Sequence, residues 1–367
     1  EFTTVAHTFT NASDGSIDVT GSESISYTGL EPIDDNLSAT NRIFHFNSAA
    51  GTITLGDDET VADDKSRITS ASSEVVTFKN PTTSLTINAG SGDNTIVLDG
   101  YDSVFNTTTI VVNGEDGQDT LNINHLLGLS ADLSGILSNA LLSIQGLPSV
   151  GYSAIENLNI DLGSGNDTMV VQSTSAATQI NSNAGTADFS VGDAGNSLDG
   201  IQGALTLNAQ AGAGDSLTIN DQADTDDNQY LLSGASFDRT GTAQISYVDF
   251  ENMTLTAGLG SDTVIVSNTP EGVTTVNGND GNDLIIVQTT SGETTINGQA
   301  GMDEALPEVG VVEDVADGAS AAHVGDAPVE THPVALLLPV LGERGAGRAD
   351  VPPVAGEEHG RVCALPA

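Results

Sequence analysis

A glycine-rich phrase ending in Asp or Asn recurs along the chain, and this repeat constrains the fold more than any other feature of the sequence. Five clear copies begin at a glycine and end at an acidic or amide residue: Gly90 to Asn94, Gly114 to Asp119, Gly163 to Asp167, Gly258 to Asp262 and Gly278 to Asp283. Looser copies end at Asp188, Asp215 and Asp303. The final residues of neighbouring copies lie 20 to 27 residues apart, or about twice that distance. Such periods are typical of solenoids, in which each repeat contacts only its neighbours.

Two other phrases reveal a longer period. An apolar residue followed by Asn precedes several glycine turns, at Ile87-Asn88, Val112-Asn113, Ile180-Asn181, Leu207-Asn208, Val276-Asn277 and Ile296-Asn297. A Tyr followed four residues later by Glu occurs at Tyr27, Tyr152 and Tyr247. Tyr152 and Tyr247 lie 95 residues apart, as do Asp167 and Asp262. We therefore interpret the longer unit as about four steps of 20 to 27 residues each.

These periods predict an all-β fold, a right-handed parallel β-helix or β-solenoid with coils of about 20 to 27 residues. Each glycine phrase would form a corner, because glycine adopts the positive φ of a sharp turn and Asp or Asn caps the turn. Val, Ile and Leu after each corner should point inward. We expect the acidic corners to lie on one edge, the tyrosines to pack at corners, and the Asn side chains to stack along the solenoid.

The pattern divides the chain into three parts. Residues 70–303 carry the regular repeats, and residues 1–69 form an N-terminal β segment with inserted sequence that we expect to be continuous with them. Ser130 to Gln145 departs from the pattern, because its leucines have near-helical spacing, so we expect a short helix or a looped-out coil there.

The repeat breaks off after Asp303. Residues 304–367 hold seven of the eleven prolines, have no Asn, Ile, Phe, Tyr, Gln or Lys, and include Cys363, the single cysteine of the chain. This Pro-, Ala-, Val- and Gly-rich tail lacks the periodicity needed to bury a face. We expect it to be disordered, as a linker or as the product of a shifted reading frame.

The chain is strongly acidic, with 51 Asp and Glu residues against 8 Lys and Arg and a formal charge of −43. This charge would repel nucleic acid and attract cations. The longest strongly apolar run, Val334 to Leu341, falls well short of the roughly 20 residues that a membrane helix needs, so we expect no membrane span. Only 4% of the residues are aromatic, which argues against a thick globular core.

The glycine phrases resemble the Gly-Gly-x-Gly-x-Asp-x-apolar nonapeptide of haemolysin-type calcium-binding repeats. The Tyr-Glu phrase and the longer unit look like repeats of very large bacterial surface proteins that carry such motifs. The similarity covers roughly residues 20 to 303. The second glycine of the nonapeptide is usually replaced here, and the phrases occur once per coil or less instead of in tandem. The resemblance implies a secreted or cell-surface bacterial protein that binds Ca²⁺.

Calcium binding at these corners also has a physical basis. Successive coils stack about 4.8 Å apart, so corners one coil apart can both contact an ion whose oxygen ligands lie about 2.3 to 2.6 Å away. Glycine corners expose backbone carbonyls and the terminal Asp adds a carboxylate, which together offer the hard oxygen ligands that Ca²⁺ prefers. The candidate metal-site residues are Asp93, Asn94, Asp116, Asp119, Asp167, Asp188, Asp215, Asp262, Asp280, Asp283 and Asp303, with the glycines Gly90, Gly92, Gly114, Gly117, Gly163, Gly165, Gly258, Gly260, Gly278 and Gly281.

We therefore expect a non-catalytic, calcium-binding structural or adhesive region, not an enzyme, whose further partners would be extracellular polysaccharide or neighbouring surface-protein modules. The alternative is a calcium-dependent β-helix polysaccharide lyase, which needs a basic residue near its metal. Up to residue 303 the basic residues are Arg42, Lys65, Arg67, Lys79 and Arg239, for which surface solubility is a sufficient explanation. A third interpretation is that Gly and Asp are turn formers without metal.

Overall fold

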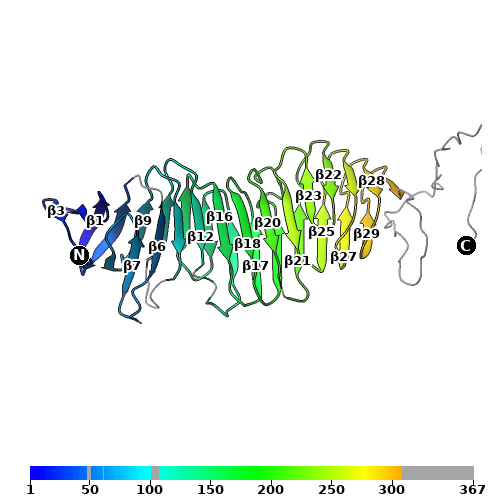
Figure 1. The fold of residues 1–367 in the computed structure, drawn as a ribbon. Coiled ribbons are helices and arrows are strands. Elements are labelled where there is room, and N and C mark those ends of the chain that lie inside the picture. Colours follow the sequence, from blue (N-terminus) through cyan, green and yellow to red (C-terminus); the bar gives the residue numbers. More distant parts are fainter. Residues whose placement is uncertain are drawn as a thin grey trace, which may run out of the picture. The chain divides into compact units, whose positions relative to one another are not determined.

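The computed structural model describes residues 1–47, 51–60, 62–100, 107–124, 126, 128–210 and 212–307. These residues form two 15-stranded β-sheets, sheet A and sheet B, which enclose a common core (Figure 1). The described part of the chain contains no helix, and therefore none that is long and apolar enough to cross a membrane. The predicted all-β fold is confirmed.

The strands are short, and each sheet draws them from the whole described chain. Sheet A contains β1 (Phe2–Phe9), β2 (Asp14–Val19), β3 (Ile25–Thr28), β5 (Ala39–His45), β9 (Ser84–Asn88), β11 (Thr109–Asn113), β13 (Ser134–Leu137), β14 (Leu141–Ile144), β15 (Ser149–Ser153), β17 (Asp167–Val171), β19 (Ala187–Val191), β21 (Ser216–Asn220), β25 (Asn252–Thr256), β27 (Val273–Asn277) and β29 (Glu293–Asn297). Sheet B contains β4 (Ile33–Asp35), β6 (Thr52–Asp57), β7 (Lys65–Ser70), β8 (Val76–Lys79), β10 (Thr95–Leu98), β12 (Thr120–Ile123), β16 (Asn157–Asp161), β18 (Ala177–Asn181), β20 (Leu205–Asn208), β22 (Gln229–Leu232), β23 (Ser236–Arg239), β24 (Ile245–Val248), β26 (Thr263–Val266), β28 (Leu284–Val287) and β30 (Glu304–Pro307).

Most of the chain alternates between the two sheets, so each coil contributes one strand to sheet A and one to sheet B. Strands in successive coils pair in parallel and in register; Thr120, for example, pairs with Thr95 and with Asn157. This arrangement is the predicted parallel β-solenoid. Strands β1 to β8 of the N-terminal part belong to the same two sheets as the later strands.

Four segments leave this pattern and form three-stranded antiparallel hairpins within one sheet, namely β1–β2–β3, β6–β7–β8, β13–β14–β15 and β22–β23–β24. They lie in sheets A, B, A and B in turn. Each adds two strands to one sheet, so that this sheet extends along the solenoid axis about 10 Å farther than the other sheet at the usual strand spacing. The next hairpin adds two strands to the other sheet and brings the two sheets level again.

The segment from Ser130 to Gln145 contains strands β13 and β14, which pair within sheet A, so the predictions of a short helix and of a looped-out coil are both wrong. Leu137 and Leu142 are buried, whereas Ile136 and Leu141 are exposed, which is the period-two alternation of strands. The near-helical leucine spacing arises because the turn of a β-hairpin falls between Leu137 and Leu141.

The 95-residue unit contains seven passages across the solenoid. From β13 to β22, the hairpin β13–β15 counts as one passage, and the strands β16 to β21 add six more. Because seven is odd, each unit begins in the opposite sheet from the one before it. Asp119 accordingly lies in a turn that leads from sheet A to sheet B, whereas its counterpart Asp215 lies in a turn that leads from sheet B to sheet A, at the other edge of the solenoid. The unit thus spans three and a half coils where about four steps were predicted, and the prediction of a single acidic edge is wrong.

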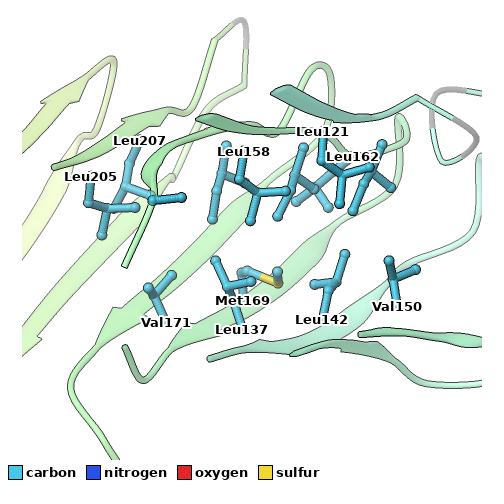
Figure 2. Close-up of a cluster of buried hydrophobic side chains, with 14 of the residues drawn as sticks. Leu121, Leu137, Leu142, Val150, Leu158, Leu162, Met169, Val171, Leu205 and Leu207 are labelled. Atoms are coloured by element: carbon cyan, nitrogen blue, oxygen red, sulfur yellow. The ribbon is translucent and has the colours of Figure 1, made fainter. Parts of the chain in front are cut away.

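The core is a double row of mainly aliphatic side chains between the sheets. In Figure 2, Leu121 and Leu158 of sheet B lie opposite Leu137 and Leu142 of sheet A. One continuous cluster of buried residues extends from Phe9 to Ile296. The predicted inward orientation of the apolar residue after each corner is confirmed for Ile96, Leu121, Met169, Val264 and Ile285.

Asparagine side chains form hydrogen-bonded stacks along the strands. The Asn113 Nδ2 donates to Asn88 Oδ1 at 2.7 Å, and the Asn208 Nδ2 donates to Asn181 Oδ1 at 2.6 Å. These pairs come from strands that neighbour each other in the same sheet. The predicted stacking of the Asn side chains is confirmed, and it satisfies polar groups at the ends of successive strands.

The repeated tyrosines lie in strands and not at corners as expected. Tyr152 is buried in β15 and Tyr247 in β24, each in the third strand of a hairpin. Their hydroxyls donate to the backbone carbonyls of Ser138 and Ser233, in the first turn of the same hairpin. The tyrosine therefore fastens the third strand of a hairpin to the turn between the first two.

The sheets extend past Asp303, because Glu304–Pro307 form β30, which pairs in parallel with β28. The strand occupies the first four residues of the tail that the sequence pattern sets apart at residue 304. The expectation of a disordered tail concerns residues 308–367, including Cys363, which lie outside the described residues.

The acidic turns as candidate functional site

The Asp residues that end the glycine phrases point into the solenoid. Asp119, Asp167, Asp215, Asp262 and Asp283 are each buried, with at most 3% of the residue surface exposed. Asp303, in the last described coil, is partly buried. A carboxylate in such a place has lost its hydration and must find hydrogen bonds or a counter-charge inside the protein.

One oxygen of each buried carboxylate bonds the coil before it. The Asp283 Oδ1 accepts a hydrogen bond from the backbone N–H of Asp262 at 2.9 Å, and Asp303 Oδ1 accepts one from Asp283 at 3.1 Å. The same bond recurs from Asn94 to Asp119 (2.8 Å), Leu133 to Asp167 (2.9 Å), Ala187 to Asp215 (2.6 Å) and Asn228 to Asp262 (2.8 Å). We call this series the inner ladder.

A second series of bonds runs in the opposite direction on the outside of the turns. At several turns the residue before the ladder position accepts a hydrogen bond from the following coil, as when Asp93 Oδ1 accepts one from Gln118 N–H at 2.9 Å. Equivalent bonds join Asn166 to Asp132 (2.8 Å), Ser261 to Asp227 (2.7 Å) and Met302 to Asn282 (2.9 Å). Asp93 therefore belongs to this outer ladder, and Asn94 takes the inner position.

The predicted acidic site residues outside the ladders, Asp116, Asp188 and Asp280, are exposed. Asp116 and Asp280 lie at the surface of their turns. Asp188 also faces solvent, because Ala187 is the residue that pairs with Asp167 in the ladder position. Ala187 has no carboxylate, and the Asp167 N–H donates instead to the backbone carbonyl of Thr186 at 2.8 Å. The sequence alignment of this looser copy is thus one residue out of register.

The second oxygen of each buried ladder carboxylate has no hydrogen-bond partner, a set formed by Oδ2 of Asp119, Asp167, Asp215, Asp262 and Asp283. Burial raises the pKa of all five carboxyls, and that of Asp262 and Asp283 reaches about 6. Each turn therefore contains an acceptor that lacks a donor or a counter-charge.

Two turns with Asn at the ladder position show what this acceptor faces. The Asn94 Oδ1 accepts from Gly51 N–H at 3.2 Å, and its Nδ2 donates to the carbonyls of Ala89 (3.3 Å) and Gly92 (2.6 Å). The Asn228 Nδ2 likewise donates to the Asp226 carbonyl at 3.1 Å. The strand register places Asp119 and Asp262 at the positions of these asparagines. An Asp at this position carries an acceptor, Oδ2, in place of the amide donor that Asn offers to the carbonyls of its turn.

The turn backbone explains the glycine positions. In the two six-residue phrases, Gly114 to Asp119 and Gly278 to Asp283, the second residue has a positive φ although it is not glycine: Glu115 at 70° and Asn279 at 75°. This is the position of the second glycine in the haemolysin-type nonapeptide. A Cβ on Gly114 would lie 2.6 Å from Asp119 Oδ2, and one on Gly281 would lie 2.1 Å from the Gly260 carbonyl oxygen. Glycine at these two sites leaves room for the carboxylate and for the neighbouring coil.

The Glu of the Tyr-Glu phrase completes the inner ladder, a role that sequence reasoning missed. Glu156 Oε2 accepts from Asp119 N–H at 2.7 Å, and Glu251 Oε2 accepts from the N–H groups of Gly214 (3.1 Å) and Asp215 (2.8 Å). The strand register sets each Glu one coil after its Asp. The signal was the spacing from Asp119 to Glu156 and from Asp215 to Glu251, 37 and 36 residues, which repeats with the longer unit.

Two of the basic residues are buried among carboxylates and are not surface solubilising groups. Arg42 is fully buried and pairs with Asp35, which also bonds the His7 imidazole at 2.9 Å. Arg239 is 6% exposed and contacts three Asp residues. Lys65 and Arg67 form ion pairs at the surface of the β6–β7–β8 hairpin region.

Within the described residues no three His, Cys, Asp or Glu side chains form a group able to hold a metal ion. The turns instead offer one carboxylate oxygen each, together with backbone carbonyls. Comparison with protein-family models and with curated proteins finds no match for this chain. The resemblance to haemolysin-type repeats therefore depends on the phrases and their geometry alone.

Proposed function

We propose that this chain is a non-catalytic structural or adhesive repeat region of a secreted or cell-surface protein, whose acidic turns are neutralised by calcium ions. The observation that carries the proposal is the row of buried, unpartnered Oδ2 atoms, which lack any donor. A buried acceptor that faces other acceptors is stabilised by a cation or by a proton. The formal charge of −43 supplies the long-range attraction for cations.

The donor atoms of the turns suit a hard cation. Asp119, Asp167, Asp215, Asp262 and Asp283 would each supply Oδ2, and the backbone carbonyl two residues earlier would supply a neutral oxygen, as Gly92 and Asp226 do for the asparagine amides. Ca²⁺ accepts six to eight oxygen ligands in flexible geometry, so water can complete a set that protein atoms fill only in part. Mg²⁺ requires a stricter octahedron and fits such a set less well.

Calcium dependence fits an extracellular location. Extracellular calcium-binding modules have dissociation constants of about 10⁻⁴ to 10⁻³ M, so the turns would fill outside the cell and stay empty in a low-calcium cytoplasm. Ion binding to the coiled state alone adds to its stability. The ordered solenoid would then present extended strands to polysaccharide or to neighbouring modules.

The geometry gives the lyase alternative no specific support. Arg42 and Arg239 are held by carboxylates inside the solenoid, where they cannot reach a polymer in solvent. Lys65 and Arg67 remain at the surface, but each is paired with an acidic side chain.

Thermal melting tests the proposal. We expect the full chain at neutral pH to melt at a higher temperature in several millimolar Ca²⁺ than in chelator, followed by far-UV circular dichroism, with a smaller effect of Mg²⁺ at equal concentration. Equal melting temperatures in chelator and in Ca²⁺ would assign the turns a purely conformational role.

A further inference from the structure

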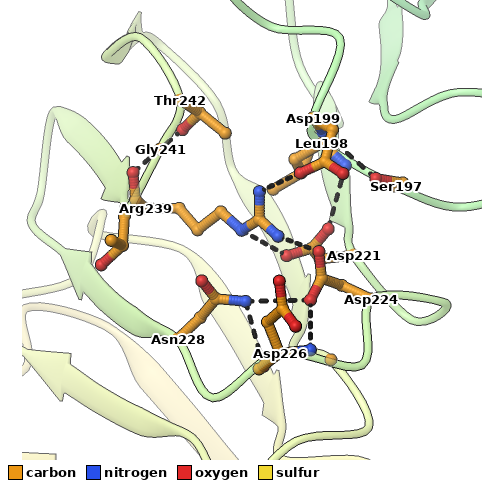
Figure 3. A network of polar contacts seen from close by, with 12 residues as sticks. Ser197, Leu198, Asp199, Asp221, Asp224, Asp226, Asn228, Arg239, Gly241 and Thr242 are labelled. Carbon is orange, nitrogen blue, oxygen red and sulfur yellow. Dashed lines mark hydrogen bonds and ion pairs between the residues drawn. The ribbon is translucent and has the colours of Figure 1, made fainter.

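In the turn between β21 and β22, an arginine contacts buried carboxylates. Arg239, at the end of β23, places its guanidinium among Asp199, Asp221 and Asp224 (Figure 3). Nη1 lies 2.6 Å from Asp199 Oδ1, Nε lies 2.8 Å from Asp221 Oδ2, and Nη2 bonds Asp224 Oδ2. The side chains of Arg239, Asp221 and Asp224 are nearly or fully buried, whereas Asp199 is mostly exposed.

Both oxygens of Asp221 are satisfied, in contrast to the ladder carboxylates. Oδ1 accepts from Leu198 N–H at 2.9 Å, and Oδ2 accepts from the Tyr230 hydroxyl at 2.8 Å and faces the guanidinium. Asn228 closes the same turn, because its amide donates to Asp224 Oδ1 at 3.0 Å and to the Asp226 carbonyl. This turn therefore has an internal cation and an internal amide, whereas the turns with a buried Asp at the ladder position have an unpartnered oxygen.

The three carboxylates come from two different turns. Asp199 lies between β19 and β20, whereas Asp221 and Asp224 lie between β21 and β22. Arg239 belongs to the β22–β23–β24 hairpin, so its guanidinium joins this hairpin to two preceding turns. Arginine suits this position because its planar fork carries several donors and keeps its charge at any physiological pH.

We propose that the acidic pocket of Asp199, Asp221 and Asp224 is a cation site whose resident ligand is the Arg239 guanidinium, so that the segment from β19 to β24 is ordered without added metal. Its contrast with the ladder turns rests on the calcium dependence proposed above. Without the guanidinium, two buried carboxylates and one exposed carboxylate would converge without a counter-charge, which is strongly unfavourable.

Amide hydrogen exchange of the full chain, in chelator and in several millimolar Ca²⁺, tests this proposal. The reporters are the amides of Leu198 and Ala223, which bond Asp221 Oδ1 and the Asn196 carbonyl beside the pocket, and those of Asp262 and Asp283 in the ladder. In chelator, the natural chain should protect the pocket amides and expose the ladder amides. Arg239→Gln should exchange the pocket amides roughly 100-fold faster than the natural chain does in chelator.

Two further variants separate charge from packing. Arg239→Lys keeps a cation and should retain most of the protection in chelator, also in the event that Arg239→Gln does not fold. Arg67→Gln removes a surface ion pair and should leave the pocket amides unchanged. Pocket protection in Arg239→Gln equal to that of the natural chain in chelator would overturn the proposal, as would an Arg239→Lys variant whose pocket amides exchange as fast as those of Arg239→Gln. Ladder amides that stay protected in chelator would contradict the calcium proposal alone.

Discussion

Asp283 Oδ1 accepts a hydrogen bond from the backbone N–H of Asp262, 21 residues earlier, at 2.9 Å. The other oxygen of the same carboxylate is buried without a partner. One side chain therefore joins two coils and at the same time leaves an unsatisfied charge inside its own turn. This division between a bonded and an unbonded oxygen determines how the turns should respond to substitution, pH and cations.

Asp283→Asn should raise the melting temperature in chelator and reduce its dependence on calcium. The amide keeps the Oδ1 acceptor and supplies a donor in place of Oδ2, as Asn94 already does in its turn. We expect a gain of about 1 kcal/mol in chelator. Asp283→Ala should instead lose about 1 to 3 kcal/mol, because the Asp262 N–H is left without its acceptor.

The matched control for these two variants is Asp280→Asn, since Asp280 lies exposed in the same turn. It should change neither the melting temperature in chelator nor the response to calcium by more than a surface substitution does. An Asp280→Asn variant that loses calcium dependence while Asp283→Asn retains it would show that the exposed Asp280 carboxylate, and not the Asp283 carboxylate of the inner ladder, binds the ion.

Replacing Glu115 by Gly should stabilise the solenoid by about 1 kcal/mol. Glu115 holds a φ of 70°, which costs energy for any residue with a Cβ. Glu115→Gln removes the charge but keeps the Cβ, and should give little of this gain. Denaturant unfolding in excess calcium measures the difference. Equal stabilisation by Gly and by Gln would indicate that charge, and not backbone conformation, limits this turn.

The pH dependence should follow the buried carboxyls when calcium is absent. The folded pKa of Asp262 and Asp283 is about 6, above the unfolded value of 3.8, so their contribution to stability is fully present below about pH 4 and is lost as the pH rises through about 6. Lowering the pH of chelated protein from 7 to 5 should therefore shift the melting temperature of the natural chain upward relative to that of Asp262→Asn/Asp283→Asn. Burial lowers the pKa of His7, which acts in the opposite direction but equally in both proteins. Identical pH profiles for the two proteins would contradict the assignment.

Glu251→Ala should weaken the second acidic edge. Its carboxylate accepts hydrogen bonds from the N–H groups of Gly214 and Asp215. In the coil after Glu251, the strand register places Gly272 at the corresponding position, and glycine has no side chain that could take over these bonds. We expect a loss of about 1 to 3 kcal/mol of unfolding free energy, measured in denaturant with saturating calcium. Glu271→Ala, at an exposed site in the following turn, is the control and should be nearly neutral. Similar losses in both variants would mean that Glu251 acts only through its charge.

The sequence predicted the coil length, the parallel solenoid and the inward apolar residues, because these follow directly from spacing and alternation. It could not predict the two acidic edges, because this depends on an odd number of passages per unit, which is known only once β13–β15 is seen to be a hairpin. Residue spacing also could not show that Asp283 points inward, because a row of inward carboxylates and a row of outward carboxylates would recur with the same spacing. The pairing of Arg239 with Asp221 and Asp224 could not be predicted either, because the β22–β23–β24 hairpin brings Arg239 back to the turn that holds the two Asp residues.

The central claim, that the buried ladder carboxylates hold calcium ions, is tested most directly by counting bound ions. Equilibrium dialysis should be performed with the full chain and with a variant that carries Asn at positions 119, 167, 215, 262 and 283. We expect the natural chain to bind several Ca²⁺ ions at millimolar concentration. The variant should show the far-UV spectrum of a folded solenoid in chelator and should bind correspondingly fewer ions. A folded variant that binds as much Ca²⁺ as the natural chain would contradict it.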